Sequence, residues 1–255
     1  MARNDVWTRE QTIVAFYYYC NIPFGQFSQN NPKVIEIARV IGRKPSAVVF
    51  KIGNLASLDP EMKRRGVGGL PNSSKMDKQI WEEFNEDWNK LSLEAAQLIA
   101  DFKNEPLEVA INIDLNDLPK GEDKLRVVKT RVYQNFFRNS VLAAYENVCC
   151  ITGIIMPDLH IASHIKPWRI DEKNRTNPQN GLCLNALHDR AFDKGLITIL
   201  PDFTIRVSRH LEEIESKEAI EKYFLSYNMK PVIRPHKFLP LPDFLEYHND
   251  VIFRK

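Results

Sequence analysis

Two histidines and an asparagine in the second half of the sequence, His164, Asn180 and His188, are of types that can carry out chemistry together. A neutral histidine has a pKa near working pH, so it can accept a proton from water, and it is also a common metal ligand. The order of the three residues matters as much as their types. If the chain between them folds back on itself, His164 and His188 can meet around one ion.

The flanking residues predict the elements that would position these side chains. The β-prone run 161–165 ends at Pro167, because proline cannot donate to a sheet ladder. A polar loop with Asn-Pro and Asn-Gly steps follows, and then the apolar triplet Leu182–Leu184. From Ala186 to Lys194 the periodicity is helical, and Gly195 suits the C-cap. The predicted order is therefore strand, loop, strand and helix, with the helix packed on the strands.

Four short motifs follow one another in this region. They read C-C-I-T-G from Cys149, A-S-H-I-K-P-W from Ala162, N-P-Q-N-G-L from Asn177 and H-D-R-A-F-D-K-G from His188. In these motifs the chain resembles the HNH endonucleases, also called ββα-metal nucleases. The specific branch has the pattern C-x-x-T-G, A-[AS]-H-I-x-P-W, N-P-x-N-G-L and H-x-x-x-F-D-x-G. The resemblance covers about 50 residues densely, plus a helix that precedes them.

The resemblance implies a role for each polar residue. His164 matches the general base that deprotonates the attacking water, and Asn180 matches the residue that steadies the loop through backbone hydrogen bonds. His188 matches the metal-binding histidine on the helix. The ion is expected to be a hard cation, Mg2+ or Mn2+, held by few protein ligands and by phosphate oxygens.

Two departures from the family pattern leave the ligand set open. The residue before the base is often Asp or His, a second metal ligand, and here it is Ser163. Many relatives also place the helix histidine one position later, where this chain has Asp189. Either His188 or Asp189, or both, could hold the ion, and Asp193 is either a further ligand or a helix-terminating hydrogen-bond acceptor. His160 shares a strand face with His164, and we expect it to have no catalytic role.

The cysteines predict no structural zinc. They stand at positions 20, 149, 150 and 183 and form no C-x-x-C pair, whereas many HNH proteins carry zinc on two such pairs. We expect Cys150 and Cys183 to be packed core thiols, reduced as in a cytosol. The N-terminal residues lack the apolar region of a signal peptide, and no apolar run approaches the roughly 18 residues that span a membrane. The prediction is a cytoplasmic protein with no membrane partner.

Charge is uneven along the chain although the net charge is only +2. Val34–Arg65 holds seven Lys and Arg against three Asp and Glu, and Asp77–Asp123 holds thirteen acidic residues against four basic. Lys124–Asn139 then carries five basic residues and no acidic one. Local basic patches on a nearly neutral protein can still follow DNA phosphates, and solvated surfaces with no partner are the alternative.

The N-terminal region predicts a helix-turn-helix. A first helix begins at the N-cap Thr8, and a second begins near Pro32, with helical periodicity over 34–41. Gly42 forms a turn, and a third helix begins near Pro45. In such a module the last helix lies in the major groove of double-stranded DNA. A small helical bundle with no DNA role is the alternative. The residues expected to contact DNA are Arg43, Lys44, Ser46 and Lys51.

A basic, glycine-rich stretch over 61–72 is a second candidate for DNA contact. Lys63, Arg64 and Arg65 would supply positive charge to a phosphate strand. The stretch lacks the order of glycine, lysine and hydroxyl that defines a nucleotide P-loop. A solvent-exposed loop without a partner is the alternative.

The chain is predicted to be an α+β protein of two domains. A helical, helix-turn-helix-like DNA-recognition domain covers 1–103, an acidic linker 104–124, and the HNH nuclease domain with a C-terminal extension 125–255. Amphipathic helical patterns over 77–102 and 126–145 belong to the first and the last of these.

The expected function is a restriction or phage-defence endonuclease that cuts double-stranded DNA, as a homodimer if both strands are cut. Two alternatives remain open. One is a DNA-binding regulator whose HNH site has decayed, which Ser163 favours. The other is a module with a latent site that acts only with a separate partner.

Overall fold

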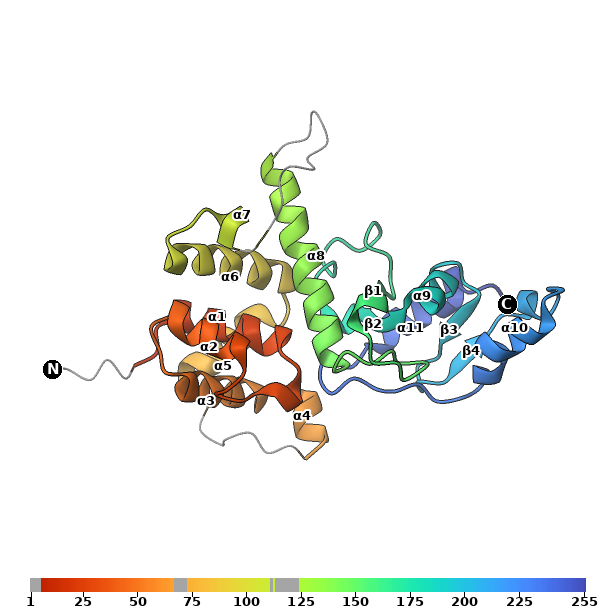
Figure 1. The fold of residues 1–255 in the computed structure, drawn as a ribbon, viewed down its shortest axis with the longest axis horizontal. Coiled ribbons are helices and arrows are strands. Elements are labelled where there is room, and N and C mark those ends of the chain that lie inside the picture. Colours follow the sequence, from red (N-terminus) through yellow and green to blue (C-terminus); the bar gives the residue numbers. More distant parts are fainter. Residues whose placement is uncertain (1–5, 67–72, 111, 113–123) are drawn as a thin grey trace. The chain divides into compact units, whose positions relative to one another are not determined.

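The structure is a computed structural model that describes residues 6–66, 73–110, 112 and 124–255 (Figure 1). The chain divides into two compact units, residues 1–140 and 141–255, and mixes helices with short antiparallel strand pairs, as an α+β fold does. Within the described residues no helix is both long and apolar enough to cross a bilayer. The helices are α1 (Arg9–Asn21), α2 (Pro32–Val40), α3 (Pro45–Ala56), α4 (Pro60–Arg64), α5 (Lys75–Phe84), α6 (Trp88–Lys103), α7 (Leu107–Ala110), α8 (Lys124–Ala144), α9 (Ala186–Asp193), α10 (Lys217–Tyr223) and α11 (Pro242–Tyr247). The strands are β1 (His160–His164), β2 (Gly181–Asn185), β3 (Ile197–Ile199) and β4 (Ile205–Val207).

The first unit is a helical bundle built around α1. Thr8 caps α1 as predicted, in a capping box with Gln11. Phe16 of α1 is fully buried, and its ring lies 5.0 Å from the ring of Trp81 and 6.0 Å from that of Trp88. The amphipathic pattern over 77–102 forms two helices rather than one, because Asp87 caps a new helix, α6, after α5 has ended.

The predicted turn between α2 and α3 is present. Gly42 has a φ of +67°, a left-handed conformation that glycine adopts without strain. The amide of Arg43 donates to the carbonyl of Ala38 at 2.7 Å, which closes the end of α2 in a Schellman motif. The chain can therefore reverse into α3 within four residues.

The helical pattern over 126–145, which we expected in the nuclease domain, forms α8. Most of this helix belongs to the first, helical unit. Val128 and Val132 of α8 join Ala96 of α6 in a buried cluster. The ring centroids of Phe136 and Trp88 lie 6.5 Å apart. The unit boundary consequently falls within α8, at residue 140. Of the predicted linker, 107–110 form α7, and 111 and 113–123 lie outside the described residues.

The second unit contains the predicted strand, loop, strand and helix. β1 and β2 pair antiparallel with His164 opposite Gly181, and α9 packs against both strands. Further along the chain β3 pairs antiparallel with β4 in a hairpin, and α10 follows it. The buried residues Leu182, Cys183 and Leu184 of β2 anchor this unit in its core.

Candidate active site

The loop after β1 is held by the side chain of Asn180. Its Oδ1 accepts from the amide of Lys166 at 2.8 Å, and its Nδ2 donates to the carbonyl of the same residue at 3.0 Å. Asn180 is 1% exposed, so both contacts are shielded from water. Two hydrogen bonds to one residue's backbone fix where β1 ends and where the loop begins.

His164 is the last residue of β1, and the same loop holds its ring. Its Nε2 lies 2.9 Å from the carbonyl oxygen of Arg175, and the Trp168 ring meets it edge-on with centroids 5.6 Å apart. A carbonyl oxygen only accepts, so Nε2 carries the proton of the neutral ring and Nδ1 carries the lone pair. Burial lowers the pKa of His164 to about 4, against the opposing effect of the Arg175 carbonyl. The ring is therefore neutral at physiological pH.

One pocket of about 360 Å³ contains His164 and two carboxylates of α9. Asp189 and Asp193 stand four residues apart, so they share one face of the helix. Ser163 precedes the histidine on β1 and lines the same pocket. The fold thus brings a neutral histidine, a hydroxyl and two carboxyl groups to one place.

Both carboxyl groups are in surroundings that disfavour their charge. Burial is the main cause that raises the pKa of Asp189; the nearby Ser163 hydroxyl opposes it, and the charge of Asp193 adds to it. Desolvation likewise raises the pKa of Asp193, against the attraction of Arg190 and Lys194. A cation in the pocket would relieve this unfavourable charge.

His188 does not face this pocket. It is 2% exposed, its Nδ1 lies 3.0 Å from Oδ1 of Asn185, and its Nε2 lies 2.9 Å from the carbonyl oxygen of Tyr223. Both ring nitrogens are thus engaged within the protein, and the Phe224 and Tyr227 rings surround the imidazole. His188, expected from the sequence to bind the metal, thus packs inside the protein and does not line the pocket.

The residues of the pocket fit a hard divalent cation with few protein ligands. The Ser163 hydroxyl is buried and makes no hydrogen bond of good geometry among the described residues. It lies in the pocket that holds the carboxylates of Asp189 and Asp193, which are oxygen donors of the kind that Mg2+ prefers. In the part of the chain that the structure describes, no three His, Cys, Asp or Glu side chains form a chelating cluster. His160 is 1% exposed and does not line the pocket.

Sequence reasoning missed three residues of this pocket: Arg169, directly after the A-S-H-I-K-P-W motif, and two residues far from the motifs. His248 and Ile252, from the end of the second unit, line it together with the motif residues. No spacing or motif in the sequence connects them with His164, because 84 residues separate the two histidines. Only the path of the folded chain could have identified them.

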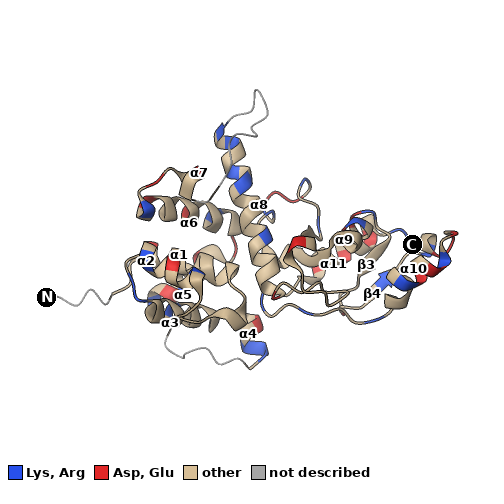
Figure 2. Ribbon diagram, in the orientation of Figure 1, with Lys and Arg blue, Asp and Glu red and all other residues tan. Residues whose placement is uncertain are grey.

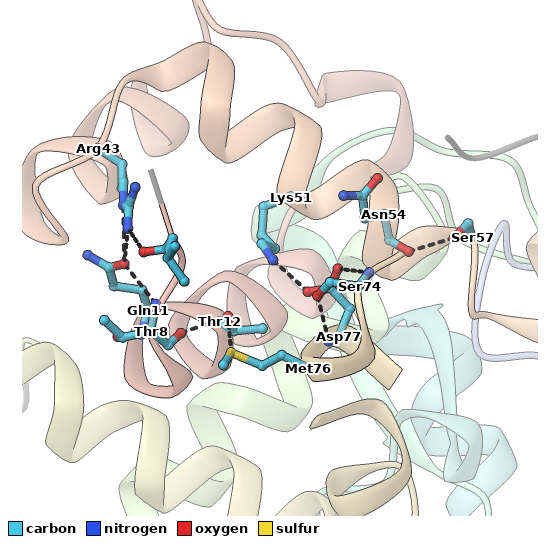
Figure 3. A network of polar contacts seen from close by, with 11 residues as sticks. Thr8, Gln11, Thr12, Arg43, Lys51, Asn54, Ser57, Ser74, Met76 and Asp77 are labelled. Atoms are coloured by element: carbon cyan, nitrogen blue, oxygen red, sulfur yellow. Dashed lines mark hydrogen bonds and ion pairs between the residues drawn. The ribbon is translucent and has the colours of Figure 1, made fainter. Parts of the chain in front are cut away.

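In the helical unit, two of the residues expected to contact DNA turn inward (Figure 3). The ammonium of Lys51 lies 2.6 Å from Oδ1 of Asp77, and the two side chains are 6% and 0% exposed. The guanidinium of Arg43 binds Oε1 of Gln11, with its Nε at 3.1 Å, and stacks over Trp7 at 5.1 Å. Lys51, expected from the sequence to contact DNA, thus lies in a buried ion pair that such a contact would expose.

The other residues expected to contact DNA lie at the surface. Lys44 is exposed and Ser46 is partly exposed, at the start of α3. The basic stretch expected as a loop begins as α4, capped by Asp59, and its residues 67–72 lie outside the described residues. Lys63, Arg64 and Arg65 are exposed at its end, although Arg64 also pairs with Glu61 at 2.6 Å. Figure 2 shows this basic group near α4 and a second one along α8.

Comparison with known proteins bears on the second unit. Residues 149–200 match a family described as HNH endonuclease. No curated protein matches the chain. The matched range contains β1, β2 and α9, and with them His164, Asn180, His188 and Asp189.

Proposed function

Because residues 149–200 match the HNH endonuclease family, we propose that the protein is a metal-dependent nuclease that hydrolyses phosphodiester bonds in double-stranded DNA. The observation that carries this proposal is the pocket in which His164 meets Asp189 and Asp193. A base and an anionic metal site in one cavity are what phosphodiester hydrolysis requires.

His164 is the general base. With its Nε2 proton donated to the carbonyl of Arg175, it offers the lone pair of Nδ1 to the proton of an attacking water. The same hydrogen bond orients the ring, and the edge of Trp168 limits its rotation. Asn180 contributes indirectly, because its hydrogen bond to the amide of Lys166 fixes the loop that directly follows His164.

Asp189 is the principal metal ligand, and Asp193 is the second. The cation, Mg2+ or Mn2+, would supply positive charge beside the scissile phosphate. The Ser163 hydroxyl stands where related nucleases often have a ligand, and it can donate a hydrogen bond to Asp189 or to a water of the site. The carboxylates must be deprotonated to bind, so their raised pKa values make metal binding depend on pH.

The helical unit binds DNA backbone. Lys44, Lys63, Arg64 and Arg65 are exposed and can contact phosphates, while Ser46 at the start of α3 can contact either a phosphate or a base. The helix α8 adds positive charge, since 124–139 hold five basic residues and no acidic one. A nuclease domain joined to a DNA-binding helical unit supports a role as a restriction or phage-defence enzyme, active as a homodimer where both strands are cut.

A second candidate function is a DNA-binding regulator, or a partner-dependent module, whose HNH site is decayed or latent. Ser163 in place of a carboxylate or imidazole ligand favours this alternative, because it removes one strong donor from the metal site. The two functions differ in one property, which is cleavage by the isolated chain.

The deciding experiment is cleavage of supercoiled plasmid and of methylated and unmethylated phage DNA with Mg2+, Mn2+ or EDTA. Wild type is compared with His164→Ala and with His210→Ala, which removes an exposed histidine of the same unit outside the pocket. We expect cutting that needs metal, that falls about 10²–10⁴-fold in His164→Ala, and that persists in His210→Ala. DNA binding without cutting under every condition would instead support the regulator or partner-dependent alternative.

A further inference from the structure

A segment outside residues 149–200 forms one wall of the pocket. Beyond α11 the chain continues as a π-helical turn, His248–Ile252. His248 and Ile252 of this turn line the pocket with Asp193. π-Helical turns are uncommon and are frequently found at functional sites.

The ring of His248 fixes the residue that precedes Asp193. It stacks on the ring of Phe192 with centroids 3.6 Å apart and an interplanar angle of 11°. Its Nε2 lies 3.1 Å from the carbonyl oxygen of Phe192, which can only accept, so the nitrogen donates. His248 therefore holds both the side chain and the backbone of the last turn of α9.

The other nitrogen of His248 connects the turn to β3. Nδ1 lies 2.8 Å from Oγ1 of Thr198. That hydroxyl also lies 2.9 Å from Oδ1 of Asn249, whose Nδ2 donates to the carbonyls of Ile199 and Leu245. His248 is 1% exposed, so water does not compete for these contacts.

The backbone at the end of α9 also contacts this segment closely. A Cβ placed on Gly195 would lie 2.1 Å from the carbonyl oxygen of Ile252, so only glycine allows this approach. The amide of Arg254 donates to the carbonyl of Gly195 at 2.9 Å. The C-terminal segment is thus attached on both sides of the helix end that carries Asp193.

The same segment reaches the loop on the other side of the pocket. The amide of Leu241 donates to the carbonyl of Gln179 at 3.3 Å, beside Asn180. The ammonium of Lys166 lies 5.2 Å from the centre of the Tyr247 ring. The segment 241–254 therefore contacts both halves of the motif.

We propose that segment 241–254 is a functional part of the nuclease site and that His248 is a positioning residue, which holds α9 so that Asp189 and Asp193 bind the cation. The inference rests on the proposed function and adds a residue to it. The interaction that does this is the hydrogen bond that Nε2 of His248 donates to the carbonyl of Phe192, the residue before the proposed metal ligand Asp193.

Two variants of the full chain separate positioning from packing. His248→Phe keeps an aromatic ring to stack on Phe192 and loses both hydrogen bonds. His248→Gln loses the ring and keeps an N–H group that can donate to the Phe192 carbonyl. His210→Phe, at an exposed histidine of the same unit, is the matched control. The probe is Mn2+ alone, with free ion measured by electron paramagnetic resonance, followed by kcat and KM for cleavage of plasmid DNA.

We expect the Mn2+ dissociation constant of His248→Phe to rise about 10-fold or more, with a lower kcat and a little-changed KM, because residues that orient ligands affect metal affinity by about 10–100-fold. His248→Gln should recover most of the affinity, and His210→Phe should equal wild type. The inference is overturned if folded His248→Phe binds Mn2+ and cuts DNA like wild type, or if His248→Gln loses as much as His248→Phe. If wild type itself neither binds Mn2+ nor cuts DNA, the proposed function fails and this inference fails with it.

Discussion

The carbonyl oxygen of Arg175 lies 2.9 Å from Nε2 of His164 and decides which nitrogen of the ring holds the proton. The two residues are eleven positions apart, and Asn180 fixes the loop that joins them. A backbone carbonyl thus contacts the imidazole in the way that a carboxylate does in the Ser-His-Asp triad. Burial of the ring, which outweighs the opposing effect of this contact on the pKa, leaves the ring uncharged over a wide range of pH.

The first prediction concerns stability as a function of pH. The pKa of His164 is about 4 in the folded protein and ordinarily 6.5. Between these pH values the unfolded chain therefore binds a proton that the folded protein does not bind. The contribution of neutral His164 to the free energy of unfolding is complete above pH 6.5 and is lost as the pH falls toward 4. For His164 the loss at pH 4.5 is about 2–3 kcal/mol. Urea unfolding at pH 7 and 4.5 measures it.

His164→Gln is the test variant, since glutamine does not titrate. The free energy of unfolding of this variant should fall less between the two pH values than that of wild type. His248, whose pKa burial also lowers to about 4, should behave in the same way. Equal pH dependence in wild type and both glutamine variants would show that these rings titrate as they do in the unfolded chain.

A second prediction separates Asp189 from its neighbour His188. Asp189→Ala should weaken Mn2+ binding by about 10–100-fold while the protein stays folded. His188→Ala removes the contacts to Asn185 and to the Tyr223 carbonyl, so it should lower the free energy of unfolding by about 1–3 kcal/mol. Its Mn2+ affinity, per folded molecule, should be unchanged. Calorimetric titration and urea unfolding together test both statements, and a loss of Mn2+ affinity in folded His188→Ala would contradict them.

A third prediction concerns the buried pair of Lys51 and Asp77. Lys51→Ala leaves the Asp77 carboxylate buried without its cation, which should cost about 3–5 kcal/mol of stability. DNA affinity of the folded variant and its salt dependence should match wild type. Lys78→Ala, at an exposed lysine one residue beyond Asp77, is the control and should alter neither.

The complementary prediction is for the exposed basic group near α4. Replacing Lys63, Arg64 and Arg65 together by alanine should weaken DNA binding uniformly across sequences. The slope of log affinity against log salt should become shallower by about 0.9 for each phosphate that the protein no longer neutralises. Fluorescence anisotropy with duplexes of unrelated sequence measures both quantities. An unchanged slope would exclude these side chains from the DNA interface.

The site could be predicted from sequence where its determinants are local. β1 ends three residues before Pro167, and α9 ends two residues before Gly195. Asn180 binds Lys166 across the loop that joins β1 to β2, so all of these determinants lie within the motif region. The choice between His188 and Asp189 could not be made in the same way. It depends on which face of α9 turns toward β1, and the partner of His188 is the Tyr223 carbonyl, 35 residues further on.

The helical unit gives the same lesson. Gly42 and the turn after α2 were predictable, because a left-handed residue and a Schellman hydrogen bond are local features. The inward direction of Lys51 was not, since its partner Asp77 lies 26 residues away. The packing of α8 in the helical unit was not predictable either, because its partners Ala96 and Trp88 are distant in the sequence.

The close approach of Gly195 and Ile252 has a consequence for the protein during its synthesis. The ribosome makes His164, Asp189 and Asp193 before it makes the segment that completes their pocket, and 59 residues separate Asp193 from Ile252. At about 5–20 residues per second, this interval is roughly 3–12 s. Throughout it the nascent chain holds His164, Asp189 and Asp193 without the wall that His248 and Ile252 supply. A pocket built in this order is completed late, so a polypeptide that stops short of this segment would lack the wall that His248 and Ile252 form.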